Sequence, residues 1–200
     1  MIVMMAGLPG TGKSTLARAL AARISGVVLD KDLIRASVFP KRLIEYSTAQ
    51  DDLVVELMLL AAAYLLRRDP AAIVILDGRT FSRKYQVDRV VAFAKQAGTP
   101  LRIAECVCSE KVALRRLQED LAERRHVAGN RNAELYREVK ARFQEIRRRK
   151  LVVRTALRLE TCVKKVLEYL DHEAELPAPS TSLRAGPVAD RQERGIRSKS

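Results

Sequence analysis

The feature that most constrains this chain lies close to its start, where an apolar run passes into a glycine-rich turn. Residues 2–6 are apolar throughout, and the segment after them fits the pattern G-x-x-x-x-G-K-[ST]. Its nine residues are Gly7, Leu8, Pro9, Gly10, Thr11, Gly12, Lys13, Ser14 and Thr15. Apolar side chains then recur at helical spacing, at Leu16, Ala17, Leu20 and Ala21. The sequence therefore predicts a strand, a glycine turn and a helix in direct succession.

This succession is suited to hold a chain of phosphates. Glycines allow successive backbone N–H groups to curl around a phosphate, and the start of the helix adds a favourable dipole. We expect residues 7–15 to bind the nucleotide. Lys13 would reach the β- and γ-phosphate oxygens, and the Ser14 hydroxyl would ligate Mg²⁺. The alternative is a glycine turn that binds no ligand.

The size and composition of the chain fit one domain. Its 200 residues suit a single α/β domain with a sizeable core. Because a strand is expected from residue 2, we expect no signal peptide, and no apolar run approaches the roughly 20 residues of a membrane span. Three cysteines, an odd number, favour reduced thiols in the cytoplasm. Cys106 and Cys108 fall on one face of an expected strand, where buried free thiols are a simpler reading than a metal site.

The net charge of +13 is high, and residues 1–173 carry 32 of the 37 basic and 21 of the 24 acidic residues. Much of the excess falls between Lys111 and Lys165, including the basic run 147–150. Such a surface attracts small anions and nucleic acid alike, so nucleic acid stays open as a partner. The alternative for the run is a solvated helix end that complements the helix dipole.

Hydrophobic patterning predicts strands that alternate with helices. The expected strands are residues 2–6, 27–29, 73–76, 101–107 and 155–160. The expected helices are residues 13–23, a short one to about 38, 48–68 with Thr48 or Asp51 as its cap, 82–98, 109–124 with Ser109 as its cap, 133–149, and a last one carrying Val163, Val166, Leu167 and Leu170. Beyond residue 173, prolines, glycines and charges occur without apolar periodicity, so we expect a disordered basic tail over 174–200.

Such alternation predicts a parallel sheet with right-handed crossovers, in which ligands bind at the carboxyl ends of the strands. That edge includes Asp30 and Asp32, with Arg35 one helical turn further on. A carboxylate here could accept the proton of an attacking hydroxyl, and an arginine could hold an acceptor phosphate or sugar. The alternative is that Asp32 is simply the cap of the helix that follows.

A second acidic position ends the expected strand 73–76. Asp77 could hold a Mg²⁺-bound water, position Lys13 or bind the acceptor, or Asp77 and Gly78 could form only a turn. Arg79 and Arg83 follow and are candidates to line an acceptor pocket, with solvated surface arginines as the alternative.

Together, residues 7–15, 29–35 and 73–81 resemble a small P-loop group described as "predicted kinases" or AAA-family ATPases. The group is related to polynucleotide 5′-kinases, gluconate kinases, chloramphenicol phosphotransferases and zeta toxins. The resemblance covers roughly residues 1–172. It implies a three-layer α/β/α sandwich with a five-stranded parallel sheet of order 2-3-1-4-5, ATP with Mg²⁺ as cofactors, and a mobile lid that carries arginines. It also aligns Asp32 with an acceptor-activating aspartate and Arg35 with its substrate-holding neighbour.

The lid is where the chain departs from that group. Within a domain over residues 1–173, we place the lid at about 116–133, with arginines that neutralise charge on the transferring phosphoryl group. The group has two arginines about five residues apart, but Leu121 occupies the second position if Arg116 is the first. A helix about one turn longer would bring Arg124 or Arg125 to the phosphates. We favour Arg116 and Arg125; other candidates are Arg115 and Arg131, and an arginine-rich surface helix is the alternative for each.

These observations predict an ATP-dependent phosphotransferase, in which Lys13, Asp32, Arg116 and Arg125 are catalytic. The acceptor would be the hydroxyl of a small molecule or of a nucleic-acid 5′ end, bound by residues that include Arg35, Asp77, Arg79 and Arg83. One alternative is a P-loop ATPase or nucleotide-dependent switch in which water replaces the acceptor. Another is a nucleic-acid-binding module, although aromatic residues for stacking are sparse.

Overall fold

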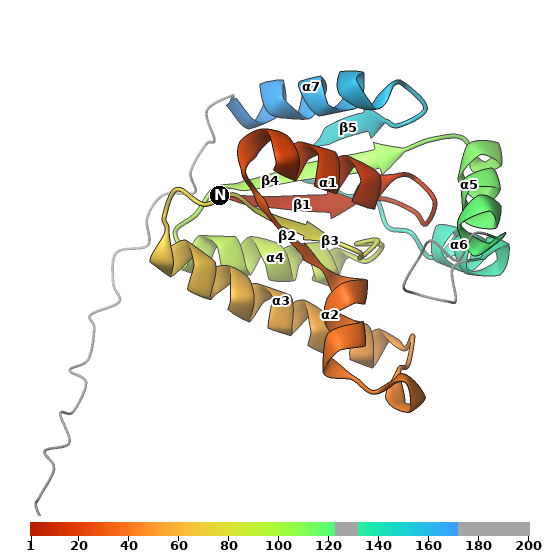
Figure 1. The fold of residues 1–200 in the computed structure, drawn as a ribbon, viewed down its shortest axis with the longest axis horizontal. Helices are drawn as coiled ribbons and strands as arrows, with labels where there is room; N and C mark the ends of the chain where they lie inside the picture. The colour runs from red at the N-terminus through yellow and green to blue at the C-terminus, as the bar shows by residue number, and fades with distance from the viewer. Residues whose placement is uncertain (123–131, 172–200) are drawn as a thin grey trace, which may run out of the picture.

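A five-stranded parallel sheet organises the part of the chain that the computed structural model describes, residues 1–122 and 132–171 (Figure 1). The strands are β1 (Ile2–Ala6), β2 (Val27–Asp30), β3 (Val74–Asp77), β4 (Leu101–Val107) and β5 (Leu151–Arg154). Their order across the sheet is β2-β3-β1-β4-β5, as predicted. The central strand β1 is buried along its whole length, which explains why it is apolar at every position.

Helices cover both faces of the sheet, so the predicted three-layer sandwich is confirmed. α1 (Lys13–Ile24) and α7 (Leu159–Asp171) lie on one face, and α3 (Thr48–Arg68) and α4 (Lys84–Gln96) on the other (Figure 1). α5 (Glu110–Ala122) and α6 (Ala133–Ala141) stand at the edge to which the arrowheads of β1 and β4 point (Figure 1). α2 (Lys31–Val38) and the short 3-10 helix η1 (Lys41–Leu43) connect β2 to α3.

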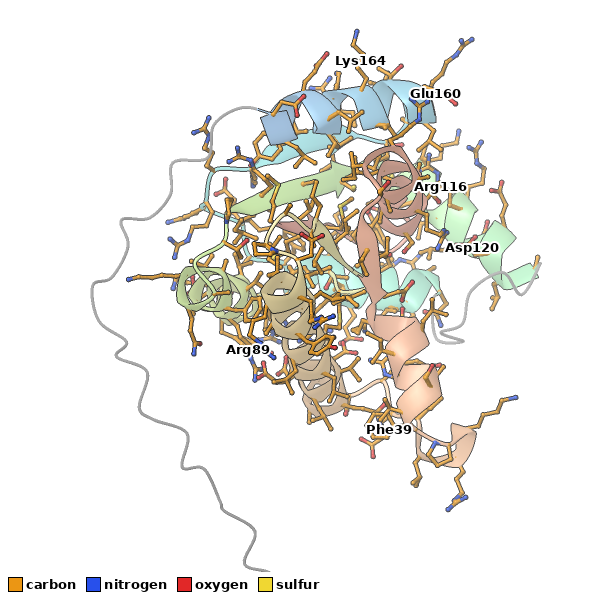
Figure 2. All side chains as sticks on the ribbon, turned by 60° about the vertical axis from the view of Figure 1, so that its left-hand side comes forward. Phe39, Arg89, Arg116, Asp120, Glu160 and Lys164 are labelled. Carbon is orange, nitrogen blue, oxygen red and sulfur yellow. The ribbon has the colours of Figure 1, made fainter. Side chains whose placement is uncertain are left out.

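Each face of the sheet has its own apolar core. Ile2 and Met4 of β1 pack in the core beneath α3 and α4, whereas Val3 and Met5 pack in the core beneath α1 and α7. This alternation follows from the two-residue period of a strand. The outer surface of α7 is charged, and Glu160 and Lys164 point away from the sheet (Figure 2). The cores hold the carboxyl ends of the strands in fixed positions.

Two predicted helix starts were wrong by a small margin. Ser47 caps α3, because its hydroxyl accepts the Gln50 N–H at 3.2 Å; neither Thr48 nor Asp51 is the cap. α4 begins at Lys84 rather than at Ser82. The Ser82 carbonyl instead accepts the N–H of Gln144 at 2.8 Å. In contrast, Ser109 accepts the Val112 N–H at 3.4 Å at the start of α5, which agrees with its predicted role as a cap.

The helix predicted over 133–149 was wrong in its second half, since α6 ends at Ala141. Long-range contacts replace the helical bonds beyond that point. The Gln144 side chain accepts the Lys84 N–H at 2.6 Å, and Ile146 is buried in the core beneath α3 and α4. The basic run 147–150 is therefore not a helix end: Arg148 pairs with Asp88 at 3.0 Å and Lys150 pairs with Glu105 at 2.7 Å.

The last strand was also misplaced. The prediction was 155–160, but β5 is Leu151–Arg154, which pairs with residues 104–107 of β4. Thr155 follows the strand, where its N–H donates to the Val107 carbonyl at 2.9 Å. The carboxyl-end rule therefore applies to Thr155, a residue that the misplaced strand concealed.

The three cysteines are free thiols, with Cys106 and Cys162 buried and Cys108 half-buried. No group of His, Cys, Asp and Glu in residues 1–122 and 132–171 is arranged to hold a metal ion by itself. Over the same ranges, no helix combines the length and apolar character needed to cross a membrane.

Replacing Ile146 with alanine tests whether the segment after α6 is anchored in the core. We expect Ile146→Ala to lower the free energy of unfolding by about 2–5 kcal/mol, because the side chain is buried. The exposed Leu60→Ala is the control, with an expected change within about 0.5 kcal/mol. Urea unfolding curves measure both, and equal effects would contradict the described packing.

The reactivity of the three cysteine thiols provides a second test of the fold. Burial raises the pKa of Cys106 to about 12, so at pH 8 this thiol stays protonated and non-nucleophilic. We expect a maleimide to label Cys108 of the native protein at pH 8, and to label Cys106 and Cys162 only after unfolding. Peptide mass spectrometry distinguishes the three. Labelling of native Cys106 as fast as Cys108 would refute the burial of this strand.

Candidate functional site

The glycine-rich loop at residues 7–15 connects β1 to α1 and needs its glycines for two reasons. Gly7, Gly10 and Gly12 have positive φ angles of 129°, 73° and 80°. In addition, a Cβ atom on Gly7 would lie 2.3 Å from the Cys106 carbonyl oxygen, and one on Gly10 would lie 2.5 Å from the Ala113 carbonyl oxygen. The loop is therefore pressed against β4 and α5 by contacts that no larger residue allows.

Lys13 holds this loop in shape from the first turn of α1. Its Nζ donates to the carbonyl oxygens of Gly7 at 2.9 Å and Leu8 at 2.8 Å, and the residue is only 5% exposed. The Thr11 hydroxyl also donates to Leu8, at 2.7 Å. Because the capping position of α1 is Gly12, no side chain satisfies the first N–H groups of the helix. Those groups are suited to receive an anion.

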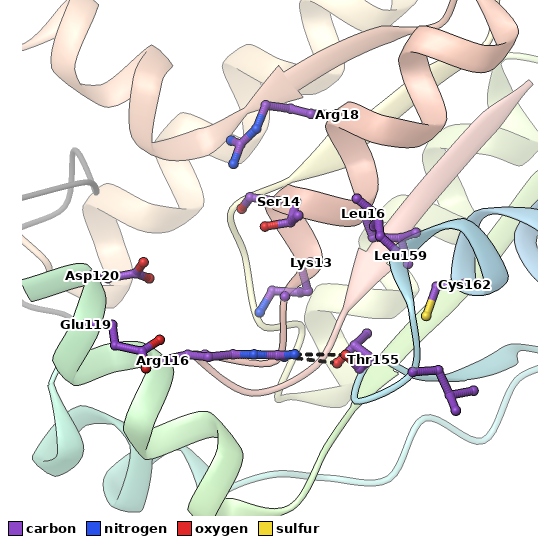
Figure 3. A pocket seen from close by; sticks show the side chains of 14 residues that line it. Lys13, Ser14, Leu16, Arg18, Arg116, Glu119, Asp120, Thr155, Leu159 and Cys162 are labelled. Atoms are coloured by element: carbon purple, nitrogen blue, oxygen red, sulfur yellow. Dashed lines mark hydrogen bonds between the residues drawn. The ribbon is translucent and has the colours of Figure 1, made fainter. Parts of the chain in front are cut away.

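A cavity of about 460 Å³ opens on one side of the loop (Figure 3). Its walls come from the loop, α1, α5 and the turn between β5 and α7, and the side chains include Lys13, Ser14, Arg18, Arg116 and Thr155. This volume lies within the range of small-molecule and cofactor sites.

Arg116 crosses the floor of this cavity toward Thr155 (Figure 3). Its Nη2 donates to the Thr155 carbonyl oxygen at 2.8 Å and its Nη1 to the Thr155 hydroxyl at 3.3 Å. That hydroxyl in turn donates to the Thr11 carbonyl oxygen at 2.7 Å. Thr155 thus fixes the guanidinium of Arg116 beside the loop, as a phosphate-binding role would require.

Of the other candidate lid arginines, only Arg115 lies among the described residues. Arg115 is exposed and lies 3.5 Å from Glu119. Arg125, Arg124 and Arg131 lie outside the described residues, as does half of the predicted lid over residues 116–133. The position of Arg116 is therefore the part of the lid prediction for which geometry exists.

A second, smaller cavity of about 90 Å³ also touches the loop. It shares Lys13 and Ser14 with the first cavity, and its other walls come from α2, α3, α6 and the turn after β3. The residues that line it include Pro9, Lys31, Asp32, Tyr46, Asp51, Gly78, Thr80, Leu135, Val139 and Arg142. The two cavities thus meet at Lys13 and Ser14.

Asp32 lines this second cavity and is not the helix cap. Asp30 caps α2, since its carboxylate accepts the N–H groups of Asp32 at 2.9 Å and Leu33 at 3.3 Å. Burial, followed by the nearby charge of Asp77, raises the pKa of Asp30. The Asp32 carboxylate is free of capping and accepts a hydrogen bond from Arg35 Nη1 at 2.7 Å.

A network of charged side chains surrounds Asp32 on α2, α3 and the turn after β3. Arg35 also contacts Asp51, and Lys31 lies 2.6 Å from Asp51 and 3.4 Å from Asp32. Arg79 lies 2.6 Å from Asp52 and 4.0 Å from Asp51. We call these six residues the ion network; they are Lys31, Asp32, Arg35, Asp51, Asp52 and Arg79.

The predicted site residues that follow β3 separate into two groups. Asp77 is buried at the end of β3, and neither of its carboxylate oxygens has a hydrogen-bond partner among the described residues. Arg79 is buried within the ion network. Arg83 is exposed at the start of α4 and lines a different cavity, with Lys84, Asp88 and residues 144–148. The structure does not bring Arg83 to the loop.

Sequence reasoning missed several side chains of the site. Asp51 was considered only as a helix cap, and Lys31, Tyr46, Asp52 and Thr155 were not considered as site residues. The two adjacent aspartates near the start of α3 were only a weak signal, because the helix dipole by itself favours acidic residues at a helix N-terminus. Thr155 would have been found from a correct boundary for β5.

Solved structures with the same fold come from several organisms. A protein from Chloroflexus aurantiacus, provisionally described as a kinase, is 22% identical, with a TM-score of 0.67 over 85% of this chain and 98% of that chain. The APS kinase CysC of Mycobacterium tuberculosis, in complex with AMPPNP and APS, is 17% identical, with a TM-score of 0.65 over 85% of this chain and 96% of that chain. Kti12 of Chaetomium thermophilum, in complex with ADP-AlF3, is 21% identical, with a TM-score of 0.60 over 85% of this chain and 97% of that chain. These likenesses show a P-loop kinase-like fold.

The sequence itself gives the family. No curated protein sequence matches the chain. A family model described as "AAA domain" matches residues 2–158. This range includes all five strands and the glycine-rich loop that borders both cavities. The predicted resemblance is thereby confirmed, and the chain belongs to this AAA domain family.

Proposed function

We propose that the protein is an ATP-dependent phosphotransferase that moves the γ-phosphoryl group of Mg-ATP to a hydroxyl group of a small molecule. The observation that carries the proposal is the meeting of two cavities at Lys13 and Ser14. A phosphoryl group at this junction would have a nucleotide on one side and an acceptor on the other. In-line transfer needs this arrangement. The nucleotide complexes of two structurally similar proteins support ATP as the donor.

On the nucleotide side, the backbone N–H groups of residues 7–15 would hold the phosphates and Lys13 would contact the β- and γ-phosphate oxygens. Arg116 would neutralise charge that develops on the transferring group, from the position that Thr155 gives it. Arg125 would be a second lid arginine, within residues 116–133.

The residues at the end of β3 and the start of α1 fit a magnesium ion. Asp77 has two buried carboxylate oxygens without a hydrogen-bond partner among the described residues, and Ser14 lies at the junction of the cavities. Carboxylate and hydroxyl oxygens coordinate Mg²⁺ directly or accept hydrogen bonds from the waters that it binds. When bound, Mg²⁺ neutralises charge on the phosphates. Asp77 and Ser14 would hold it and its waters.

On the acceptor side, Asp32 is the proposed general base. The acceptor hydroxyl would give its proton to the Asp32 carboxylate while its oxygen forms a bond to the γ-phosphorus and ADP leaves. Arg35 fixes the carboxylate at 2.7 Å. We assign Arg35 and Arg79 to positioning within the ion network, because both are buried and paired with carboxylates.

The surroundings of the site favour a small acceptor. The net charge of +13 supports attraction of a nucleic-acid 5′ end, but an acceptor cavity of about 90 Å³ favours a small molecule. Three free thiols support a reducing compartment, and we propose the cytoplasm.

Replacing Asp32 with asparagine tests the assignment of the base. We expect Asp32→Asn to lower transfer to acceptor by about 10²–10⁴-fold, because the side chain can no longer take a proton. Affinity for Mg-ATP should stay within about twofold of the native value, since Asp32 is not a wall of the nucleotide cavity. The measurement is label transfer from γ-labelled ATP to pooled sugars, nucleosides, antibiotics and 5′-hydroxyl oligonucleotides, with calorimetry for affinity.

Lys13→Ala is the contrasting variant and should lose affinity for Mg-ATP. Undiminished transfer by Asp32→Asn would show that another group is the base. Phosphate release by the native protein at one rate, whether or not acceptors are present, would instead favour an ATPase or a nucleotide-dependent switch.

Asp77→Asn tests the magnesium assignment. We expect the Mg²⁺ concentration for half-maximal turnover to rise by about 10–100-fold, as for other groups that orient a metal's ligands. Titrating Mg²⁺ at fixed ATP measures this change. Asp69→Asn, at the opposite end of α3 from the site, is the control and should leave the requirement unchanged. An unchanged requirement in Asp77→Asn would remove Asp77 from the metal site.

A further inference from the structure

The charge of the ion network is balanced. Lys31, Arg35 and Arg79 supply three cations, and Asp32, Asp51 and Asp52 supply three carboxylates. Every cation has a carboxylate oxygen within 2.7 Å. All three cations are also buried, at 7%, 2% and 3% exposure for Lys31, Arg35 and Arg79. The network therefore presents no spare positive charge to the cavity.

Burial closes Arg35 to a ligand, and its face and both Nη atoms are already in contact with other side chains, whereas its buried Nε has no hydrogen-bond partner among the described residues. Its guanidinium carbon lies 5.3 Å from the centroid of the Tyr46 ring, and its Nη atoms contact Asp32 and Asp51. Two further cations line the cavity with Lys31: Lys13, which the nucleotide phosphates would engage, and Arg142, which lies 2.5 Å from Glu138. An anionic acceptor would have to break one of these pairs or remain unpaired beside the carboxylates of the network, and either outcome weakens binding.

Besides the cations Lys13, Lys31 and Arg142 and the hydroxyl-bearing residues Ser14, Tyr46 and Thr80, the cavity is lined by hydrogen-bond acceptors and apolar surface. Asp32 and Asp51 line it, and ionised carboxylates only accept hydrogen bonds. The short contacts of both carboxylates with Lys31 and Arg35 are made through Oδ1. On Asp51, Oδ2 lies 4.0 Å from Arg79, beyond hydrogen-bonding distance. Leu135 and Val139 of α6 add an apolar wall.

We infer that the acceptor is an uncharged compound rich in hydroxyl groups, such as a sugar, a polyol or a nucleoside, and carries neither phosphate nor carboxylate. Its hydroxyls donate to the carboxylates of Asp32 and Asp51, while its C–H surface packs on α6. A cavity of about 90 Å³ holds the volume of about three water molecules, so it receives the hydroxyl-bearing end of the compound. This inference rests on the proposed function, because it names the acceptor of the same site.

Matched acceptors test the inference with the full-length protein and γ-labelled Mg-ATP. The pairs are a hexose and its 6-phosphate, the same hexose and its hexonate, glycerol and glycerol 3-phosphate, and a nucleoside and its 3′-monophosphate. We expect the uncharged member of the best pair to have a kcat/KM about tenfold or more above its anionic partner. A preference for the anionic member would overturn the inference and leave the phosphotransferase proposal standing.

Variants that unbalance the network supply a readout that loss of structure cannot imitate. Asp51→Asn leaves one cation in excess, so the ratio of kcat/KM for anionic over uncharged acceptors should rise by about tenfold. If Asp51→Asn does not fold, Asp52→Asn removes the partner of Arg79 and should shift the ratio in the same direction. Asp88→Asn removes a carboxylate paired with Lys84 and Arg148 outside the cavity, and should leave the ratio unchanged.

An unchanged ratio in the folded Asp51→Asn or Asp52→Asn protein would overturn the role of charge balance. A native protein that binds Mg-ATP in calorimetry but labels no member of any pair, and none of the wider acceptor pool, would overturn the phosphotransferase proposal, and this inference with it. Preferential labelling of uncharged acceptors by the native protein, together with a shifted ratio in the variants, is the result we expect.

Discussion

The site depends on the close approach of the glycine-rich loop to two carbonyl groups. At Gly7 and Gly10 the loop passes so near to Cys106 and Ala113 that a methyl group at either glycine would overlap a backbone oxygen. This contact brings β4 and α5 against the loop. Since Arg116 is on α5 and Thr155 follows the strand beside β4, their position at the loop is a consequence of the same packing. One steric requirement thus places residues from distant parts of the chain.

The two cavities differ in the balance of charge among the groups around them. The nucleotide side has helix N–H groups, Lys13 and Arg116, which suit a highly charged phosphate chain. The proposed acceptor side has as many carboxylates as cations in its ion network, and its arginines are held by those carboxylates. Positive charge is therefore available where a triphosphate would lie. In the second cavity, by contrast, carboxylates neutralise the cations of the ion network. A basic net charge of the whole chain says little about the charge of either cavity.

Local sequence patterns predicted the parts of the fold that local physics decides. β1, the loop, α1 and β4 followed from apolar runs and glycine spacing, whereas the order of the sheet was implied by the family resemblance. Asp32 was predicted at the correct edge of the sheet. The sequence did not predict that Asp30, and not Asp32, caps the helix that follows. The errors at residues 142–160 have a different origin: Ile146 and Gln144 leave the helical pattern because of partners about sixty residues away. The partnership of Asp51 with Arg35 is likewise non-local, and no spacing rule contains it.

Lys13 fastens the loop through the carbonyl oxygens of Gly7 and Leu8. These bonds join the first turn of α1 to the beginning of the loop, so contacts within the chain itself give the loop its shape. We expect diffusion and electrostatic attraction to set the rate at which a triphosphate binds. The entropic cost of ordering the loop is met when the protein folds and not at each binding event.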